Sequence, residues 1–177
     1  FDLPHGIDVD ETGDIWVSDG HNRRIQVLDS IGTWKRQIGV GRQLLQEGMP
    51  EQSSDATNAV DAFQLPAGIA LDDRGHLFVV DAFQFTVDIY DVDGTWIDSY
   101  GDFGTRDGDF KYPSGVSYDP ARRLLAVSDT LNNRVQIFEV TLPGDNVLLT
   151  RARRYALSPL CYGPIVLLIV LIVLWII

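Results

Sequence analysis

The strongest constraint on the fold of this chain is an internal repeat. A stretch that begins Pro-x-Gly and ends in Asp occurs three times, at residues 4–10, 66–72 and 113–119. Each copy is followed by a short apolar run that also ends in Asp, at residues 15–19, 77–81 and 125–129. Self-similarity at one spacing is typical of repeat architectures. The unit is about 47 residues long, with about 15 extra residues between Val40 and Ala62 in the first copy.

Each unit divides into four short apolar runs that are separated by turn residues. In the first unit the runs cover residues 7–9, 15–17, 25–28 and 34–38, and Asp93-Gly94 in the second unit is a strong hairpin signal. Four antiparallel strands in every unit are typical of a β-propeller blade, whereas a helical solenoid needs apolar residues three and four apart. We therefore predict an all-β propeller. Its blades are expected at about residues 1–40, 63–101 and 110–150.

The repeat resembles the NHL repeat. The resemblance rests on the Pro-x-Gly stretch, on the apolar run ending in Asp, and on the sequences at residues 22–27 (Asn-Arg-Arg-Ile-Gln-Val) and 132–137 (Asn-Asn-Arg-Val-Gln-Ile). It covers about residues 1–150 and implies an NHL-type β-propeller, most often six-bladed, that serves chiefly as a binding or scaffolding platform. The second unit departs from the pattern, because residues 84–86 read Gln-Phe-Thr where the others carry Asn and Arg.

Three blades of an expected six do not close a ring. An open arc would leave apolar blade faces in water, so the blades need further neighbours. Since the only methionine is Met49, we expect additional blades before Phe1. Two copies of the chain, contributing three blades each, are the second arrangement that the sequence leaves open.

One aspartate recurs in each unit, at the end of the second apolar run. Asp19 and Asp129 are each followed five residues later by an arginine, Arg24 and Arg134, whereas Asp81 has none. We expect a charge-assisted Asp–Arg pair within a blade. Because the pair is repeated, it favours a structural role over a catalytic one, and we assign no catalytic residues.

His5 is the weak candidate for a metal ligand. It lies in Pro-His-Gly, and this tripeptide resembles the zinc-binding positions of peptidyl-hydroxyglycine lyases, which are implied to carry a histidine there on alternate blades. Zinc in a catalytic site needs three protein ligands. The matching residues here are Ala67 and Ser114, so the expected metal set is none.

Two acidic stretches, residues 91–94 and 107–109, raise the alternative of bound calcium. Asp and Gly are also the residues that tight turns favour, and this simpler interpretation leads us to expect no cofactor. Structural calcium or zinc stays an open alternative.

Residues that are not repeated are the candidates for binding a partner. These are Phe83 and Phe85 in the altered second unit, and Arg42 beside the extra residues. The net charge of −11 disfavours nucleic acid, so we expect protein partners. The function expected is that of an interaction or scaffold module in a membrane complex. The alternative is a propeller hydrolase or lyase with a metal at the channel mouth.

The end of the chain predicts a membrane anchor over residues 151–177. Arginines at 151, 153 and 154 precede an uncharged segment, and a helix over residues 160–177 would reach about 27 Å, close to the thickness of a bilayer core. A buried core helix is the alternative. The basic flank alone favours a cytoplasmic propeller, whereas the resemblance to bacterial membrane-anchored NHL-like proteins implies an extracytoplasmic one, which we expect here. The residues expected at the membrane interfaces are Tyr155, Tyr162 and Trp175.

Two tryptophans test the alignment of the repeats. Trp34 and Trp96 each follow Gly-Thr, so both are expected near the start of a fourth strand, facing a neighbouring sheet. The extra residues between Val40 and Ala62 are expected to form a surface excursion between blades.

Overall fold

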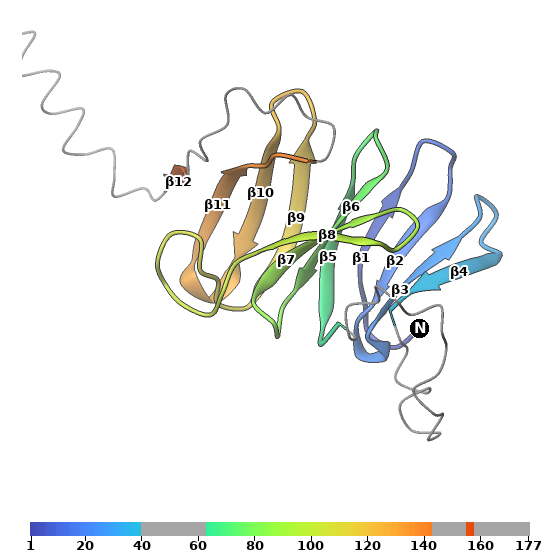
Figure 1. Ribbon diagram of the computed structural model, residues 1–177. Helices are drawn as coiled ribbons and strands as arrows, with labels where there is room; N and C mark the ends of the chain where they lie inside the picture. The colour runs from blue at the N-terminus through green and yellow to red at the C-terminus, as the bar shows by residue number, and fades with distance from the viewer. Residues whose placement is uncertain (40–62, 143–154, 158–177) are drawn as a thin grey trace, which may run out of the picture.

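The structure is a computed structural model, and it describes residues 1–39, 63–142 and 155–157. These residues form three four-stranded antiparallel sheets that lie side by side as blades (Figure 1). The all-β class and the β-propeller architecture expected from the repeat are therefore confirmed. Each sheet follows the order of the chain, as expected for strands joined by hairpins.

The first and second sheets begin and end where the repeat predicts. The first contains β1 (Pro4–Val9), β2 (Ile15–Asp19), β3 (Arg24–Leu28) and β4 (Trp34–Ile38), with a short 3-10 helix, η1 (Gly20–Asn22), between β2 and β3. The second contains β5 (Pro66–Leu71), β6 (His76–Asp81), β7 (Thr86–Asp91) and β8 (Trp96–Tyr100).

The third sheet takes its last strand from beyond residue 150, where the sequence places the end of the blades. It contains β9 (Pro113–Asp119), β10 (Leu124–Asp129), η2 (Thr130–Asn132), β11 (Arg134–Glu139) and β12 (Tyr155–Leu157). The backbone of Tyr155 pairs with Ile137, so this residue forms part of the third sheet. A strand of three residues is too short to show the apolar alternation by which the other strands are found.

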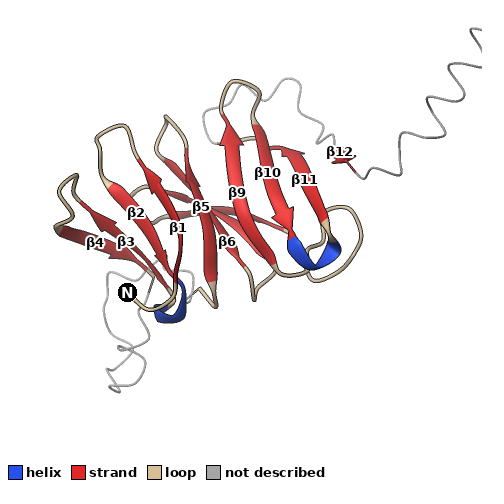
Figure 2. Ribbon diagram, turned by 180° about the vertical axis from the view of Figure 1, so that it is seen from behind, coloured by secondary structure: helices blue, strands red, loops and turns tan. Residues whose placement is uncertain are grey.

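The glycine of the Pro-x-Gly stretch allows the inner strands to approach one another closely. β1, β5 and β9 are neighbours in the centre of Figure 2. A Cβ on Gly6 would lie 2.5 Å from the carbonyl oxygen of Ala67, and one on Gly68 would lie 2.6 Å from that of Ser114. The repeat therefore needs glycine at this position, because any side chain would separate adjacent blades.

The hydrophobic core lies between the blades, in two clusters. The middle blade is covered on both faces, so residues 77–80 are completely buried. The first blade is covered on one face only by the described residues. Ile69 is 6% exposed, whereas its counterpart Ile7 is 66% exposed. The described blades thus form an arc. That further blades or a second copy of the chain cover its open faces remains a prediction.

The structure confirms the alignment of the two tryptophans and corrects their expected burial. Trp34 pairs with Leu28 and Trp96 pairs with Tyr90, each next to a shift in register at the start of the fourth strand. Both are exposed, by 56% and 41%. The fourth strand is the last strand of its sheet, so it has a neighbouring strand on one side only.

Several expectations fall on residues outside the described ranges. They are the excursion at residues 40–62 with Arg42, and the predicted membrane helix with Tyr162 and Trp175. Within the described ranges, no helix has both the length and the apolar character needed to cross a membrane.

Candidate binding surface

A buried aspartate fixes one end of each blade. Asp19, Asp81 and Asp129 are fully buried at the ends of the second strands. Each accepts a hydrogen bond from the backbone of the segment that leads into the inner strand of the same blade. The donors are the N–H groups of Asp2 at 2.7 Å, Gln64 at 2.6 Å and Lys111 at 2.7 Å. The aspartates therefore hold the loops at this end of the arc in fixed positions.

The predicted Asp–Arg pairs are present in the first and third blades. Arg24 Nε lies 2.9 Å from Asp19 Oδ2, and Arg134 Nε lies 2.8 Å from Asp129 Oδ2. Burial acts to raise the pKa of Asp19, but hydrogen bonds from the Asp2 backbone, Asn22, Arg24 and Gln26 outweigh it, so the pKa lies below its usual value. This carboxylate is thus held ionised, as a structural anchor needs.

The second blade replaces this charge pair with different chemistry. Thr86 takes the place of the arginine, and Asp88 takes the place of Gln26 and Gln136, whose amides donate to the aspartates of the other blades. Asp81 instead accepts the backbone N–H groups of residues 83 and 84, both at 3.0 Å. At its beginning, the connection between β6 and β7 is therefore held by Asp81 and by the hydrogen bond from the Ala82 N–H to the Leu65 carbonyl at 3.0 Å.

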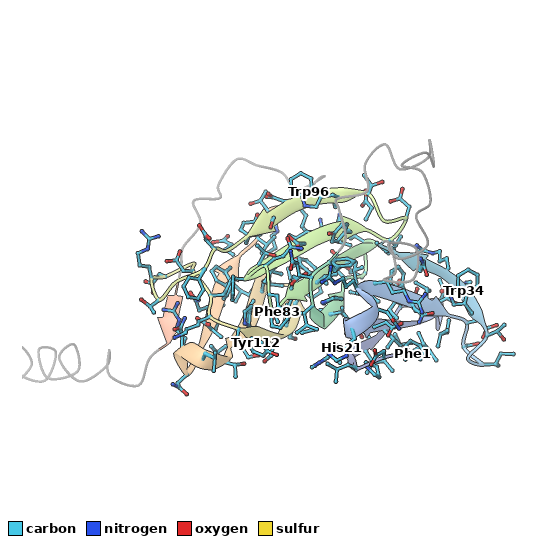
Figure 3. The ribbon with its side chains drawn as sticks, turned by 90° about the horizontal axis from the view of Figure 1, so that it is seen from below. Phe1, His21, Trp34, Phe83, Trp96 and Tyr112 are labelled. Atoms are coloured by element: carbon cyan, nitrogen blue, oxygen red, sulfur yellow. The ribbon has the colours of Figure 1, made fainter. Side chains whose placement is uncertain are left out.

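Four ring-bearing residues lie along one side of this end of the arc, while Trp96 lies on the opposite side (Figure 3). They are Phe1, His21, Phe83 and Tyr112, which we call the aromatic rim. Phe83 is 53% exposed, and the centre of its ring lies 5.8 Å from that of Tyr112. His21 Nδ1 lies 3.3 Å from Asp2 Oδ1. The rim joins loops from all of the described blades and offers an apolar surface.

Sequence reasoning found Phe83 and missed Tyr112. Tyr112 directly precedes the third Pro-x-Gly stretch, where the other units have Leu3 and Leu65. An apolar residue thus recurs at this position, and that recurrence indicates packing in the blade. The aromatic partner across the blade boundary appears only when the two loops are brought together.

Phe85 occupies the expected position in the repeat, but it is not an exposed contact residue. Its φ of 63° matches those of Arg23 (56°) and Asn133 (51°), which confirms the register. Its side chain is half-buried against the core, with its ring centre 4.9 Å from that of Phe103. Left-handed backbone is costly for a bulky residue. The packing of Phe85 stabilises a conformation that asparagine would adopt more easily.

The described residues do not fit a zinc site at His5. His5 is exposed near the start of β1, and its counterparts are Ala67 and Ser114. The Ser114 hydroxyl is engaged by Ser128 at 3.1 Å and Thr130 at 2.8 Å. In the described ranges, no group of three or more His, Cys, Asp or Glu is placed to hold a metal ion.

The two acidic stretches have the geometry of turns and ion pairs. In the first, the N–H of Gly94 donates to the Asp91 carbonyl at 2.8 Å. In the second, Arg106 lies 2.8 Å from Asp109. A further arginine, Arg134, lies 3.6 Å from Asp107. The acidic side chains of the second stretch thus face arginines.

Comparison with known proteins agrees with this fold. The family model for the NHL repeat matches residues 1–28 and 110–138, which is consistent with a protein of the NHL-repeat class. These matches fall in the first and third blades. The second blade, which replaces the Arg and Gln of its neighbours, lies outside them.

Curated relatives include two proteins of peptide amidation. The chain is 26% identical over 154 residues to a probable peptidyl-alpha-hydroxyglycine alpha-amidating lyase of Caenorhabditis elegans, covering 85% of this chain and 41% of the relative. It is 26% identical over 145 residues to the peptidylglycine alpha-amidating monooxygenase of Rattus norvegicus, covering 78% of this chain and 14% of the relative. The chain thus spans less than half the length of either relative.

Among solved structures, a streptogramin B lyase has a similar fold. The TM-score is 0.57 at 17% identity, over 88% of this chain and 41% of the lyase chain. At this identity the similarity shows the fold alone.

Proposed function

We propose that this chain is part of a propeller interaction module that binds a protein segment across the aromatic rim. The observation that carries the proposal is Phe83. It is a large apolar side chain, more than half exposed, on a loop that a buried carboxylate holds in place through two backbone hydrogen bonds. Exposed aromatic residues on a fixed backbone are preferred anchors in protein interfaces, since little entropy is lost when they are covered.

The rim uses positions that the blade itself does not need. The repeated aspartates and arginines are already engaged in holding the loops, as their hydrogen bonds show. Phe83 has Gly20–Asn22 and Thr130–Asn132 as its counterparts in the other blades, and these segments form short 3-10 helices. Among the described blades, Phe83 aligns with His21 and Leu131, so a phenylalanine at this position is specific to the second blade, which supports a role in contact.

The charge of the chain supports a protein partner. A net charge of −11 repels phosphate backbones, whereas a peptide with apolar or basic side chains meets no such barrier. We further propose that residues 160–177 anchor the module in a membrane as a single span, with the propeller on the extracytoplasmic side, because this segment is apolar and long enough to cross. The partner would then be another subunit of a membrane complex.

A library of random linear peptides, selected on the full chain, tests the rim. Peptides that bind the wild type should lose about tenfold or more in affinity for Phe83→Ser, a change typical of an interface anchor. The matched control is Trp96→Ser, which removes an exposed aromatic side chain from the opposite side of the arc. Equal affinities for the wild type and Phe83→Ser would overturn the proposal.

The alternative function is that of a propeller lyase with a metal at the channel mouth. It is supported by the similarity to the C. elegans protein, a probable amidating lyase. His5 would then contribute one ligand, and the others would come from residues outside those described. Calorimetric titration of the full chain with zinc distinguishes the two. If the protein is a lyase, it should bind zinc, and His5→Ala should abolish that binding. If it is an interaction module, His5→Ala should leave the zinc titration unchanged.

A further inference from the structure

The buried end of the second blade contains two carboxyl groups where the other blades contain an ion pair and an amide. Asp81 is fully buried and Asp88 is 6% exposed. Within the described residues, neither carboxylate pairs with an arginine or lysine. In the first and third blades the same positions hold Asp, Arg and Gln. The exchange of Arg for Thr86 and of Gln for Asp88 removes a positive charge and adds an ionisable acid.

Among the residues that the structure describes, the hydrogen-bond donors to Asp88 are all neutral. Ser99 Oγ donates to it at 2.6 Å from β8, and Thr86 Oγ1 lies 3.2 Å away on its own strand. Hydroxyl groups can serve a neutral carboxyl as well as an ionised one, because they both donate and accept. The surroundings therefore accommodate a protonated Asp88, which would be as uncharged as the glutamines of the other blades.

The charged groups on the elements packed around Asp88 do not compensate a negative charge on it. Asp81 on β6 repels it, and Tyr90 on β7 has a pKa raised by burial and by these two aspartates. Asp98 lies beside Ser99 on β8. On β3 and β4 of the first blade, Arg24 contacts Asp19 and Gln37, Arg36 contacts the Val92 carbonyl, and Lys35 contacts Asp14. His76 on β6 is paired with Asp72 at 2.7 Å.

The two carboxyl groups hold the two ends of the loop that carries Phe83. Asp81 accepts the N–H groups of Phe83 and Gln84 at the beginning of the loop. Asp88 accepts the Thr86 hydroxyl at its end. Repulsion between the carboxylates would therefore act on both ends of this loop.

Resting on the proposed function of the aromatic rim, we propose that Asp88 is a proton-operated regulator of the Phe83 loop. Protonated Asp88 leaves Asp81 without a second charged carboxylate beside it at this end of the blade, and the loop stays fixed. Ionised Asp88 places two like charges in the same buried site and loosens the loop. Burial raises the pKa of Asp88 and outweighs the hydrogen bonds from Ser99 and Thr86, which lower it; the charge of Asp81 adds a smaller increase, in agreement with this geometry. Mild acidification then fixes Phe83 for binding.

The sign of the effect on folding follows from linkage. A carboxyl whose pKa is raised in the folded state stabilises the fold below its unfolded value of 3.8, and this stability is lost as the pH rises through the folded pKa. Asp88→Asn carries no ionisable group. The ratio of its folding equilibrium constant to that of the wild type should rise by up to about tenfold per pH unit in this window and then level off.

The experiment measures urea unfolding and amide hydrogen exchange of the full chain from pH 4 to pH 7, without any partner. We expect exchange at residues 83 and 84 to speed up with pH, beyond its intrinsic pH dependence, in the wild type but not in Asp88→Asn. Asp98→Asn, an exposed aspartate one residue from Ser99, should behave as the wild type. A pH-independent ratio, or the same exchange profiles in both proteins, would overturn the proposal.

Two further measurements separate the possible failures. If Asp88→Asn does not fold, carbon NMR of the wild-type Asp88 carboxyl decides, because a midpoint at or below 3.8 contradicts the regulator. Library-selected peptides should bind the wild type more tightly at pH 5 than at pH 7, and Asp88→Asn equally at both. If no selected peptide loses affinity for Phe83→Ser, the rim proposal fails. Urea unfolding and amide hydrogen exchange then still test whether Asp88 titrates and loosens the loop.

Discussion

The centre of the Phe83 ring lies 5.8 Å from that of Tyr112, and this pair joins the β6–β7 loop of the second blade to the segment that precedes β9 in the third. Buried aspartates fix both backbones: Asp81 accepts the N–H of Phe83, and Asp129 accepts the N–H of Lys111, the residue before Tyr112. The aromatic rim is therefore positioned by the same side chains that build the blades. The geometry of the rim therefore depends on the hydrogen bonds that Asp81 and Asp129 accept.

Loss of Arg134 should destabilise the protein more than loss of Arg24. Both arginines pair with a buried aspartate, but Arg134 also donates to the backbone carbonyls of Arg106 and Asp109 and so fixes the loop between the second and third blades. We expect Arg134→Ala to cost about 3 kcal/mol of unfolding free energy, as for other broken buried pairs. Urea unfolding measures both costs.

The control for the arginines is Arg122→Ala. Arg122 is 75% exposed and pairs with Asp119 at the surface, so its removal should change stability little. Equal effects of Arg122→Ala and Arg134→Ala would contradict the anchoring role of the buried pair.

Alanine at Gly68 should prevent the normal packing of the second and third blades. The added Cβ would lie 2.6 Å from the Ser114 carbonyl oxygen and 2.8 Å from the Gly115 Cα, and neither backbone can move without opening the sheet. We expect a loss of at least about 2 kcal/mol or of cooperative unfolding. Gly32→Ala, with no atom within 4 Å but a φ of 87°, should cost only the backbone strain, about 1–2 kcal/mol.

Phe85→Asn should lower stability even though it relieves backbone strain. Asparagine adopts a φ near 63° more easily than phenylalanine, but it removes the contact with Phe103 and with the core. A double-mutant cycle with Phe103→Ala should give a coupling of about 0.5–1.5 kcal/mol, which is typical of an aromatic pair. A more stable Phe85→Asn would show that strain outweighs packing at this site.

Acidification below pH 3.8 should destabilise the first blade through Asp10, in the direction opposite to Asp88. Partial burial acts to raise the pKa of Asp10, but hydrogen bonds from the Thr12 hydroxyl, the Trp16 indole and the backbone of residues 12 and 14 lower it below 3.8. The stability it contributes is therefore present above that value and is lost as the pH falls through the folded pKa.

Thermal unfolding between pH 2 and pH 5 checks this. The wild type should lose stability faster than Asp10→Asn as the pH falls, so that the two midpoints converge. Parallel pH profiles would show that Asp10 does not titrate as described.

Repetition explains why much of the fold could be predicted from the sequence. Asp19 with Arg24 and Asp129 with Arg134 occur at one spacing, so their pairing and the order of the strands follow from the alignment. The departure at residues 84–86 could also be located. The structural consequence of this departure could not be predicted. Whether Phe85 faces solvent or Phe103 depends on the position of the loop that contains Phe103.

The remaining differences share that cause. The exposure of Trp34 and Trp96 depends on where each outer strand ends relative to the next blade. β12 is too short to leave a pattern, and Tyr112 resembles a packing residue until Phe83 is placed beside it. Position in a repeat can be found from the chain alone, whereas side-chain surroundings between repeats need the assembled blades.

The most direct test of the binding surface is a hydrogen-exchange footprint of a library-selected peptide on the full chain at pH 5. The account predicts new protection at residues 82–85, at residues 111–112 and around His21, which together surround the aromatic rim. Protection confined to the outer strands β4 and β8, around Trp34 and Trp96, would contradict it.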